Sequence, residues 1–367
     1  MRFYATVPMG LEEISSEEIE ELGGRIYSIR EGKGRVFFEG NQELVPKLNF
    51  FSRTLERVLI LIENTCIDEL KDIYTCMKSL DYSFIKPYQS FAIRSLRVGK
   101  HDFTSIDISR EAGQGVIDSY MLSKGHRLKV NLDNPDVIIR VDLIHDELFV
   151  GLDTTGDNAL HKRWYRVYNH PAPLNTAIAS SMIRLSGWKE GKILLDPMCG
   201  GGTIPIEAAM KMRDIPPGKN RKFAYFNFMG KILPDYTEKE IFSPIYGFDR
   251  FRKHVNGAIE NAKEAGVLDT IQFMKKDFLK VEDFEANFII TNPPYGLRIG
   301  KKRIIEELYT GLFERAVNML KGDSVLILIT PHKGLVEEII AKLGFTTLDM
   351  IPVKYGNLDT TIFKLKI

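Results

Sequence analysis

Four short segments of the sequence place polar, glycine and aromatic residues directly after apolar runs. In chain order they are DPMCGGGT (196–203), GFDR (247–250), KDF (276–278) and ITNPPYG (290–296). The glycines let the backbone pass close to a ligand, and a helix predicted to start at Thr203 offers free amide groups. The spacing is neither GxGxxG nor a phosphate loop, and Asp196 would repel a phosphate. The first segment therefore favours a ligand with a cationic group, such as the sulfonium or amino group of S-adenosylmethionine.

The second and third segments each end a predicted strand with an acid. Asp249 is placed to accept hydrogen bonds from both hydroxyls of a ribose, as acids at the end of a second strand do in dinucleotide sites. Asp277 could accept from an adenine amine, and Phe278 could stack on the adenine ring. Taken singly, each acid could simply cap the next helix. Acids at three successive strand ends favour a nucleoside site, with which a capping role for Asp249 is compatible.

ITNPPYG combines two acceptors, two prolines and an aromatic ring. The prolines end the strand and fix two φ angles, so the turn is stiff. The Asn292 side-chain oxygen and the Pro293 carbonyl could accept both N–H bonds of an exocyclic amine, which stabilises the cation that forms during methylation. Tyr295 offers a face on which a planar base can stack. A strand-ending turn alone would explain the prolines but not the Asn and the Tyr.

Alternating strand and helix patterns surround these segments and predict a parallel sheet wrapped by helices. Ligands bind outside the carboxyl ends of such strands, where the four segments lie. The segment 213–243 is longer than a minimal fold of this kind needs, and either a lid or a surface excursion would fit it. We expect strands at 192–195, 245–248, 271–275, 288–291 and 325–329, helices at 203–212, 251–265, 304–320 and 335–343, and a C-terminal hairpin at 346–353 and 360–367.

The first 155 residues predict smaller α+β units. A ferredoxin-like unit is suggested by strands at 2–7, 25–30, 35–39 and 58–62, with one helix from about residue 9 to 23 and another from Asn41 to about Arg57. A second unit is predicted to contain helices at 67–80 and 105–121 and strands at 90–97, 129–132, 137–142 and 148–152. The stretch from Thr154 to Asn175 is periodic for neither structure, and we expect a linker there.

Composition describes an ordinary globular protein and gives few clues to a partner. The 367 residues carry 50 basic and 49 acidic side chains, so binding of a polyanion would depend on local patches. Three widely spaced cysteines and seven histidines without ligand spacing predict no disulfide framework and no metal site. The sequence has no apolar run near the roughly 18 residues of a membrane span, and its first residues lack the core of a signal peptide. We expect a cytoplasmic protein.

In their order, the four segments resemble the motifs of class I S-adenosylmethionine-dependent amino-methyltransferases. Upstream, HPAPLN (170–175), FAIR (91–94) and DISREAGQGVI (107–117) are similar to stretches of THUMP-domain RNA guanine-N2 methyltransferases. The NPPYG form resembles the tRNA enzymes of that family, which make N2-methylguanosine at position 6 of the acceptor stem.

The resemblance covers essentially the whole chain and implies an α/β protein. A C-terminal Rossmann-like class I methyltransferase domain, with a seven-stranded mixed sheet, would follow an α+β ferredoxin-like plus THUMP module. The implied domains are an N-terminal ferredoxin-like domain at 1–64, a THUMP RNA-binding domain at 65–155, a linker at 156–175 and the methyltransferase domain at 176–367.

The resemblance also assigns roles to matching residues. The methionine part of the cofactor would be surrounded by Pro171, Ala172, Pro173, Leu174, Asp196, Cys199, Gly200, Gly202 and Thr203. Asp249 would hold the ribose with Arg250 beside it, and Asp277 with Phe278 would hold the adenine. The guanine would be held by Asn292, Pro293 and Tyr295, which would act as the catalytic residues. Asn292 would also border the cofactor.

A THUMP-like domain implies that the partner is tRNA, held by its acceptor stem and single-stranded 3′ end. The candidate RNA contacts are Arg94, Arg97, Lys100 and Arg110 in the THUMP region and Arg298, Lys301, Lys302 and Arg303 near the active site. Each basic residue alone is more often a solvated surface charge. An acceptor-stem guanine must be flipped out of its duplex, at a cost of roughly a few kcal/mol. We expect a monomer that needs neither a membrane nor a metal.

Other functions fit parts of this pattern. The same chemistry could act on a guanine of ribosomal RNA, or on position 10 of tRNA, against which the Asn in place of Asp argues. Enzymes that methylate a glutamine of a release factor, or adenine or cytosine amines in DNA, also contain NPP-aromatic turns. Those functions leave the first 155 residues unexplained. A non-catalytic RNA-binding protein with an inactive methyltransferase fold would bind tRNA without the cofactor, and the intact acids at three strand ends argue against it.

Overall fold

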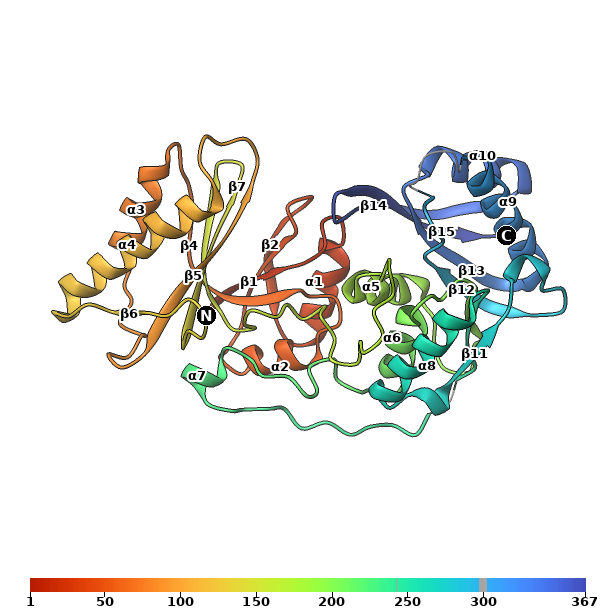
Figure 1. Cartoon of the computed structure of the whole chain (residues 1–367), viewed down its shortest axis with the longest axis horizontal. Coiled ribbons are helices and arrows are strands. Elements are labelled where there is room, and N and C mark those ends of the chain that lie inside the picture. The colour runs from red at the N-terminus through yellow and green to blue at the C-terminus, as the bar shows by residue number, and fades with distance from the viewer. Residues whose placement is uncertain (242, 297–301) are drawn as a thin grey trace.

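The computed structural model describes residues 1–241, 243–296 and 302–367, whose elements form two sheets flanked by helices (Figure 1). The first sheet and its helices comprise β1 (Arg2–Thr6), α1 (Glu12–Glu21), β2 (Arg25–Arg30), β3 (Arg35–Glu39), α2 (Leu44–Phe51), β4 (Arg57–Cys66), α3 (Leu70–Ser79), β5 (Ser90–Val98), α4 (Ser105–Lys124), β6 (Lys129–Val130), β7 (Val137–Ile144) and β8 (Glu147–Asp153). The later elements are α5 (Thr176–Ser186), β9 (Leu194–Asp196), α6 (Thr203–Met212), α7 (Phe226–Met229), β10 (Ile245–Asp249), α8 (Arg252–Ala265), η1 (Leu268–Thr270), β11 (Ile271–Lys275), η2 (Phe278–Lys280), β12 (Ala286–Thr291), α9 (Lys302–Met319), β13 (Leu320–Thr330), α10 (Lys333–Leu343), β14 (Thr346–Tyr355) and β15 (Leu358–Lys366).

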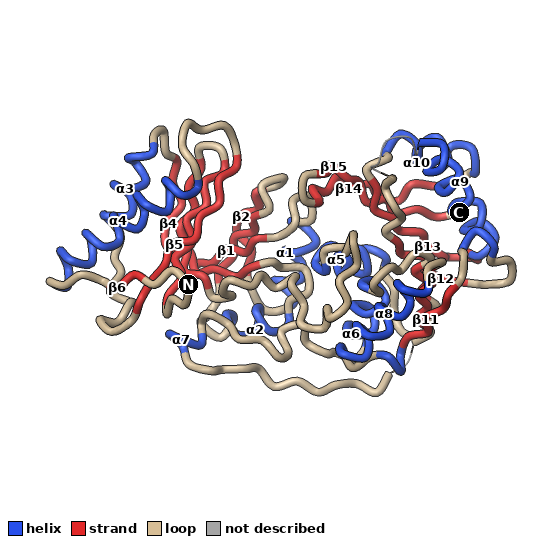
Figure 2. The backbone as a smooth tube through the Cα atoms, in the orientation of Figure 1, coloured by secondary structure: helices blue, strands red, loops and turns tan. Residues whose placement is uncertain are grey.

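The first eight strands form one continuous sheet in the order β2-β3-β1-β4-β8-β7-β5-β6 (Figure 2). Its first four strands are antiparallel and follow the order of a ferredoxin-like unit, as the sequence predicts. β4 joins the two modules, because it pairs with β1 on one side and with β8 on the other. We expected this strand to end at Ile62, before the polar residues Glu63 and Asn64, and therefore did not predict the continuous sheet.

Two helices of the N-terminal region illustrate how side-chain hydrogen bonds set helix boundaries. α4 begins at Ser105 as predicted, because the Thr104 side chain accepts a hydrogen bond from the backbone amide of the residue three positions later. α2 ends at Phe51, earlier than the predicted Arg57. Glu18 of α1 causes this early end, because its carboxylate accepts hydrogen bonds from the Ser52 hydroxyl and from the next two backbone amides. A contact across 34 residues cannot be read from helical periodicity.

The second sheet has seven strands in the order β11-β10-β9-β12-β13-β15-β14. Strands β9 to β13 are parallel, and the C-terminal hairpin adds β15 antiparallel to β13, which confirms the predicted mixed sheet. The strand order reverses between β9 and β12. In open α/β sheets, the ligand-binding crevice forms outside the carboxyl ends of the strands at such a switch point.

α5 was not predicted, although its start and stop signals are present in the sequence. Asn175 caps its first turn by accepting from the Ala177 amide (2.9 Å), and Gly187 ends it with a φ of 71°. Most of its residues are buried. α5 packs against α6 and against α1, which places it between the two sheets (Figure 1).

Candidate active site

Two adjoining cavities lie along the carboxyl ends of β9, β10 and β12, with volumes of about 480 Å³ and 40 Å³. The residues that border both cavities are His170, Ala172, Met198, Gly200 and Asn292. A single elongated ligand can therefore extend from one cavity into the other at the switch point of the sheet.

The structure brings most of the predicted site residues together around these cavities. Of the predicted cofactor residues, those that border a cavity are Ala172, Pro173, Leu174, Asp196, Cys199, Gly200, Thr203, Asp249, Arg250, Asp277, Phe278 and Asn292. The predicted catalytic residues Pro293 and Tyr295 border the larger one. Pro171 and Gly202 are not among the bordering residues. Gly202 instead precedes α6 with a φ of 80°, a conformation that favours glycine.

Asp196 ends β9 in the smaller cavity, and its side chain is buried. One carboxylate oxygen, Oδ1, accepts hydrogen bonds from the Thr291 hydroxyl (3.0 Å) and the Met198 amide (3.2 Å). Burial raises the pKa of Asp196 to about 7, because lost hydration outweighs these two hydrogen bonds. A cationic ligand group placed in this cavity would compensate for the lost hydration, and this agrees with the preference predicted from the sequence.

The acids after β10 and β11 form short-range hydrogen bonds to the backbone and also face the larger cavity. Asp249 accepts from the Phe251 amide (2.8 Å) through Oδ1 and from the Gly200 amide (3.2 Å) through Oδ2. Asp277 accepts from the Leu279 amide (3.3 Å) at the start of η2. The capping role and the ligand-facing position are thus compatible for both acids. The Asp249 contact also ties the glycine turn after β9 to the end of β10.

The turn after β12 presents Asn292 to both cavities, with its side-chain oxygen already engaged. The Tyr295 hydroxyl donates to Asn292 Oδ1 at 2.7 Å, and the His332 ring nitrogen Nε2 lies 2.7 Å from the Tyr295 carbonyl oxygen. Burial raises the pKa of Tyr295, so this phenol remains a neutral donor. The Tyr295 hydroxyl therefore holds in place the Asn292 oxygen that we predicted to accept from a substrate amine.

Two histidines that we did not assign from the sequence border the larger cavity. The His170 and His254 rings meet edge to face with centroids 4.4 Å apart, and the Tyr168 hydroxyl lies 2.8 Å from His254 Nδ1. His170 also covers the glycine turn, since a Cβ on Gly200 would lie 3.1 Å from its Nε2. His170 directly precedes the motif at 171–174 and could have been included with it, whereas His254 lies in an ordinary amphipathic helix.

Tyr355, at the end of β14, is a further residue that the sequence did not reveal. Its ring borders the larger cavity, and its hydroxyl donates to the Pro173 carbonyl at 2.5 Å. Arg166 supports the same loop by donating to the Leu174 carbonyl. The C-terminal hairpin thus holds the loop at 171–174 against the cavities, and a contact across 182 residues leaves no pattern in the sequence.

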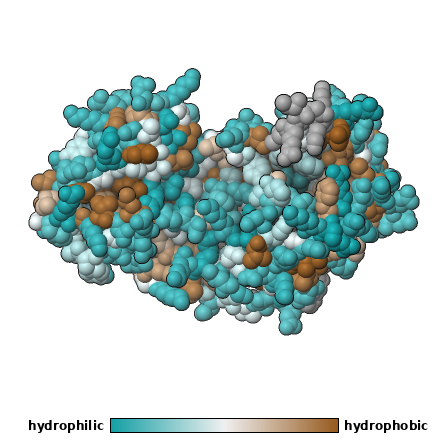
Figure 3. Space-filling model, viewed as in Figure 1, coloured by the Kyte–Doolittle hydropathy of each residue, from teal (hydrophilic) through white to brown (hydrophobic). Residues whose placement is uncertain are grey.

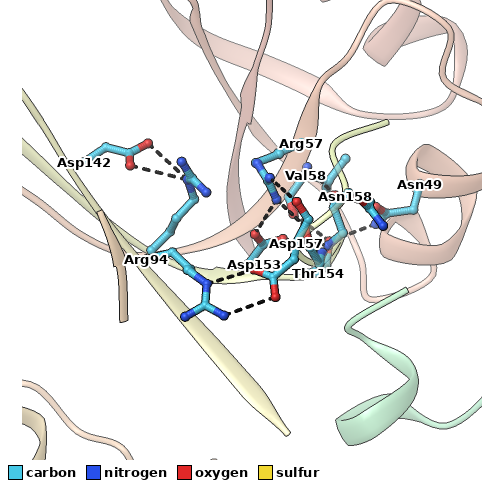
Figure 4. A network of polar contacts seen from close by, with 12 residues as sticks. Asn49, Arg57, Val58, Arg94, Asp142, Asp153, Thr154, Asp157 and Asn158 are labelled. Carbon is cyan, nitrogen blue, oxygen red and sulfur yellow. Dashed lines mark hydrogen bonds and ion pairs between the residues drawn. The ribbon is translucent and has the colours of Figure 1, made fainter. Parts of the chain in front are cut away.

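The side chains predicted to contact RNA differ in their exposure and in the ion pairs that they form. Arg94 donates hydrogen bonds to Asp157 at 2.8 and 3.1 Å. Figure 4 shows the two side chains facing each other. Arg97 and Lys100 lie in and just after β5, and the exposed Arg110 forms an ion pair (3.1 Å) with Asp107 on its own helix. Near the cavities, Arg298 and Lys301 lie outside the described residues, Lys302 is the first residue of α9, and Arg303 is 91% exposed beside Glu307.

Two features are absent from the described part of the chain. Within it, no helix is long and apolar enough to cross a membrane. In the same residues, no group of three or more His, Cys, Asp or Glu side chains is arranged to hold a metal ion.

Three family models match the chain. The model described as "RMKL-like, methyltransferase domain" matches residues 163–364, the RlmL ferredoxin-like domain matches residues 2–59 and the THUMP domain matches residues 68–153. The matched ranges follow the order of the modules expected from the sequence.

The chain is also similar to named proteins and to solved structures. It is 50% identical to a protein of Archaeoglobus fulgidus named tRNA (guanine(6)-N2)-methyltransferase, over 100% of this chain and 92% of that protein, and 50% identical to one of the same name from Methanocaldococcus jannaschii, over 100% of both. A possible methylase from Clostridium difficile 630 has a TM-score of 0.85 at 29% identity, over 99% of this chain and 97% of that one. The chain therefore belongs to the family of RMKL-like methyltransferases that carry N-terminal ferredoxin-like and THUMP domains.

Proposed function

We propose that the protein transfers the methyl group of S-adenosylmethionine to the exocyclic N2 of a guanosine in tRNA, at position 6 of the acceptor stem. The observation that carries this proposal is the placement of Asn292 at the junction of the two cavities, beside an acid-lined site. The printed names of the two relatives at 50% identity support guanine N2 and position 6.

The smaller cavity suits the methionine part of the cofactor. The buried carboxylate of Asp196 suits a positively charged group, and Thr203 and Cys199 complete the walls of this cavity. Burial raises the pKa of the Cys199 thiol well above its ordinary value, so this side chain stays neutral and adds no second negative charge. In the larger cavity, Asp249 can accept from ribose hydroxyls, and Asp277 with Phe278 can bind adenine.

Asn292 and Pro293 are the acceptors that the reaction requires. The lone pair of a guanine amine is delocalised into the ring, and acceptors aimed at its two N–H bonds localise it on nitrogen. S-adenosylmethionine, when bound, would supply a methyl group on a sulfonium. The amine would attack this methyl group in line as the carbon–sulfur bond breaks, and S-adenosylhomocysteine would leave. Asn292 Oδ1 exchanges the Tyr295 hydroxyl for the amine, and the Tyr295 ring stacks on the base. The methylated amine is acidic enough to lose its proton to water.

We assign the tRNA-binding surface to half-buried and exposed basic side chains on the THUMP domain and near the cavities of the methyltransferase domain. Arg97, Lys100 and Arg110 would contact the RNA on the THUMP domain, and Arg303 would contact phosphates near the target, with Arg298, Lys301 and Lys302 beside it in the sequence. Arg94 would have to exchange Asp157 for a phosphate. Figure 3 shows mostly hydrophilic side chains between the two lobes on the visible face. We further propose that the protein works as a monomer, without a metal, in the cytoplasm.

The proposal is tested by incubating the purified protein with labelled cofactor and tRNA transcripts. We expect label to enter a transcript with guanosine at position 6 and not a matched transcript with adenosine there. Absence of methylated guanosine from the first transcript would overturn the proposal. Binding of tRNA without binding of S-adenosylhomocysteine would instead identify a non-catalytic RNA-binding protein.

Ribosomal RNA is the second candidate substrate. The chain is 32% identical to a protein of Acinetobacter baumannii named ribosomal RNA large subunit methyltransferase K/L, but it spans only 46% of that protein. Protein-free large-subunit RNA in the same assay separates the two substrates, since the leading proposal predicts label in the tRNA alone.

A further inference from the structure

The insertion between α6 and β10 connects the methyltransferase domain with both N-terminal domains. Residues 213–241, here called the strap, leave α6, reach the first sheet at α7 and return along one side of the molecule (Figure 1). The strap contributes no residue to the borders of the two cavities, as far as the described residues show. The described part of the strap therefore does not cover the cavities as a lid would. Its contacts with both N-terminal domains also distinguish it from a loose surface loop.

The base of the strap is fixed on the methyltransferase domain. Arg213 forms ion pairs with Asp269 (2.8 Å) and, across the strap, with Glu238 (2.6 Å). A few residues further on, the Gly218 amide donates to the Phe50 carbonyl (2.9 Å) at the end of α2. The two backbones touch here, because a Cβ on Gly218 would lie 2.6 Å from the Phe50 Cα.

The middle of the strap belongs to the core of the ferredoxin-like domain. Phe223 and Tyr225 are 3% and 0% exposed and pack among the apolar side chains of the first sheet and α2. The Tyr225 amide donates to the Thr154 carbonyl at 3.1 Å, next to a second backbone hydrogen bond of the same kind. Because burial of large aromatic side chains in a core is strongly stabilising, these two residues hold the strap firmly.

The tip of the strap contacts the THUMP domain. The Asn227 side chain donates to the Asp136 carbonyl (3.1 Å), and the Gln89 side chain donates to the Asn227 carbonyl (3.1 Å). Phe228 packs against the cores of both the THUMP and the ferredoxin-like domain. A segment of the methyltransferase domain is therefore hydrogen-bonded to the THUMP domain itself.

We propose that the strap is a positioning element, which fixes the THUMP domain relative to the guanine pocket and so contributes to the choice of guanosine. This inference rests on the proposed function. An RNA held on the THUMP domain presents its target to a distant cavity only if the separation between the two is fixed. A displacement of about 1 Å from the reactive geometry can cost about 100-fold in rate. The continuous first sheet joins the THUMP domain to the ferredoxin-like domain, and the strap adds a direct connection from the THUMP domain to the methyltransferase domain that resists such displacement.

The experiment compares two tRNA transcripts, one natural and one with a base pair inserted between position 6 and the 3′ end. The measured quantity is the ratio of kcat/KM for methylation of the target guanosine in the two transcripts. Gly218→Ala forces the strap away from α2, and Gly334→Ala is the matched control, because a Cβ there meets no atom within 4 Å. Asn227→Ala is a second, milder variant at an exposed position. Hydrogen exchange of residues 213–241 measures the release of the strap.

For the wild type and Gly334→Ala, we expect kcat/KM to be at least tenfold higher with the natural transcript than with the lengthened one. For Gly218→Ala and Asn227→Ala, we expect this ratio to be at least threefold smaller than in the wild type. Affinity for S-adenosylhomocysteine should remain unchanged, because the strap does not touch the cavities. Equal methylation of both transcripts by the wild type, or an unchanged ratio in a variant with faster exchange in the strap, would overturn the inference. If the wild type methylates no guanosine in either transcript, the result would overturn the proposed function instead.

Discussion

Asp196 combines a cost in stability with a role in binding, and the two effects can be measured separately. Its carboxylate is buried, and burial raises its pKa from 3.8 to about 7. An acid with a raised pKa in the folded state binds protons more tightly there than in the unfolded chain. Its contribution therefore destabilises the fold progressively as the pH rises from about 4 to 7, and fully above 7. At about 1.4 kcal/mol per pKa unit, the total cost is about 4 kcal/mol.

Asp196→Asn removes this cost and keeps the side-chain oxygen that accepts from Thr291 and Met198. The new amide N–H₂ group is buried as well, which costs about 1–3 kcal/mol. We therefore expect the variant to be about 1–3 kcal/mol more stable than the wild type at pH 8.5 and no more stable at pH 4.5, where the remaining cost of the buried acid is only about 1 kcal/mol. Denaturant unfolding at both pH values, without cofactor, measures the difference.

Affinity for S-adenosylhomocysteine should change in the opposite direction. Loss of a charge-assisted contact with the ligand's amino group is worth about 1.5–3 kcal/mol, or about 10- to 100-fold in Kd by calorimetry.

Asp142→Asn is the matched control in the first sheet. This buried acid pairs with Arg35 at 2.6 Å, so its loss leaves a buried charge unpaired and destabilises the fold. A variant Asp196→Asn that is less stable than the wild type at pH 8.5, or that binds S-adenosylhomocysteine equally well, would refute this reasoning.

Three further predictions concern the reaction and the RNA. Asn292→Ala should keep the affinity for S-adenosylhomocysteine within about twofold and lower kcat about 100- to 1000-fold, because the amine loses a preorganised acceptor; retained turnover would exclude the assigned role. Tyr355→Phe should weaken binding of S-adenosylhomocysteine about 3- to 10-fold through the loss of one hydrogen bond to the loop at 171–174, whereas Tyr82→Phe, which loses a similar bond far from the site, should bind normally. Lys100→Ala and Arg110→Ala should each reduce the slope of log K for tRNA against log salt by about 1, and an unchanged slope would remove that residue from the interface.

The methyltransferase domain could be predicted well because its local signals agree with one another. The glycines and acids after β9, β10 and β11 mark strand ends, and parallel strands bring those ends to one edge of the sheet. The structure accordingly gathers Asp196, Asp249 and Asn292 around two adjoining cavities. Pro171 is the exception among the motif at 171–174, because the next three residues, and not this proline, border the cavities.

The features that could not be predicted depend on contacts between segments far apart in the chain. Tyr355 reaches the loop at 171–174 across 182 residues, and the early end of α2 depends on Glu18. The continuous first sheet depends on the pairing of β4 with β8 from Leu59 to Cys66, which joins two units far apart in the chain. The strap has aromatic residues at 223–228, but its sequence does not say which core they enter.

Mass spectrometry of digested tRNA tests the central claim most directly. After incubation of the wild type with an unmodified tRNA transcript and S-adenosylmethionine, we expect N2-methylguanosine at position 6, and we expect its initial rate of formation to be about 100- to 1000-fold lower with Asn292→Ala. A methyl group on another atom of the base, on a guanosine elsewhere in the tRNA, or at position 6 at an equal initial rate with the variant would contradict the central claim.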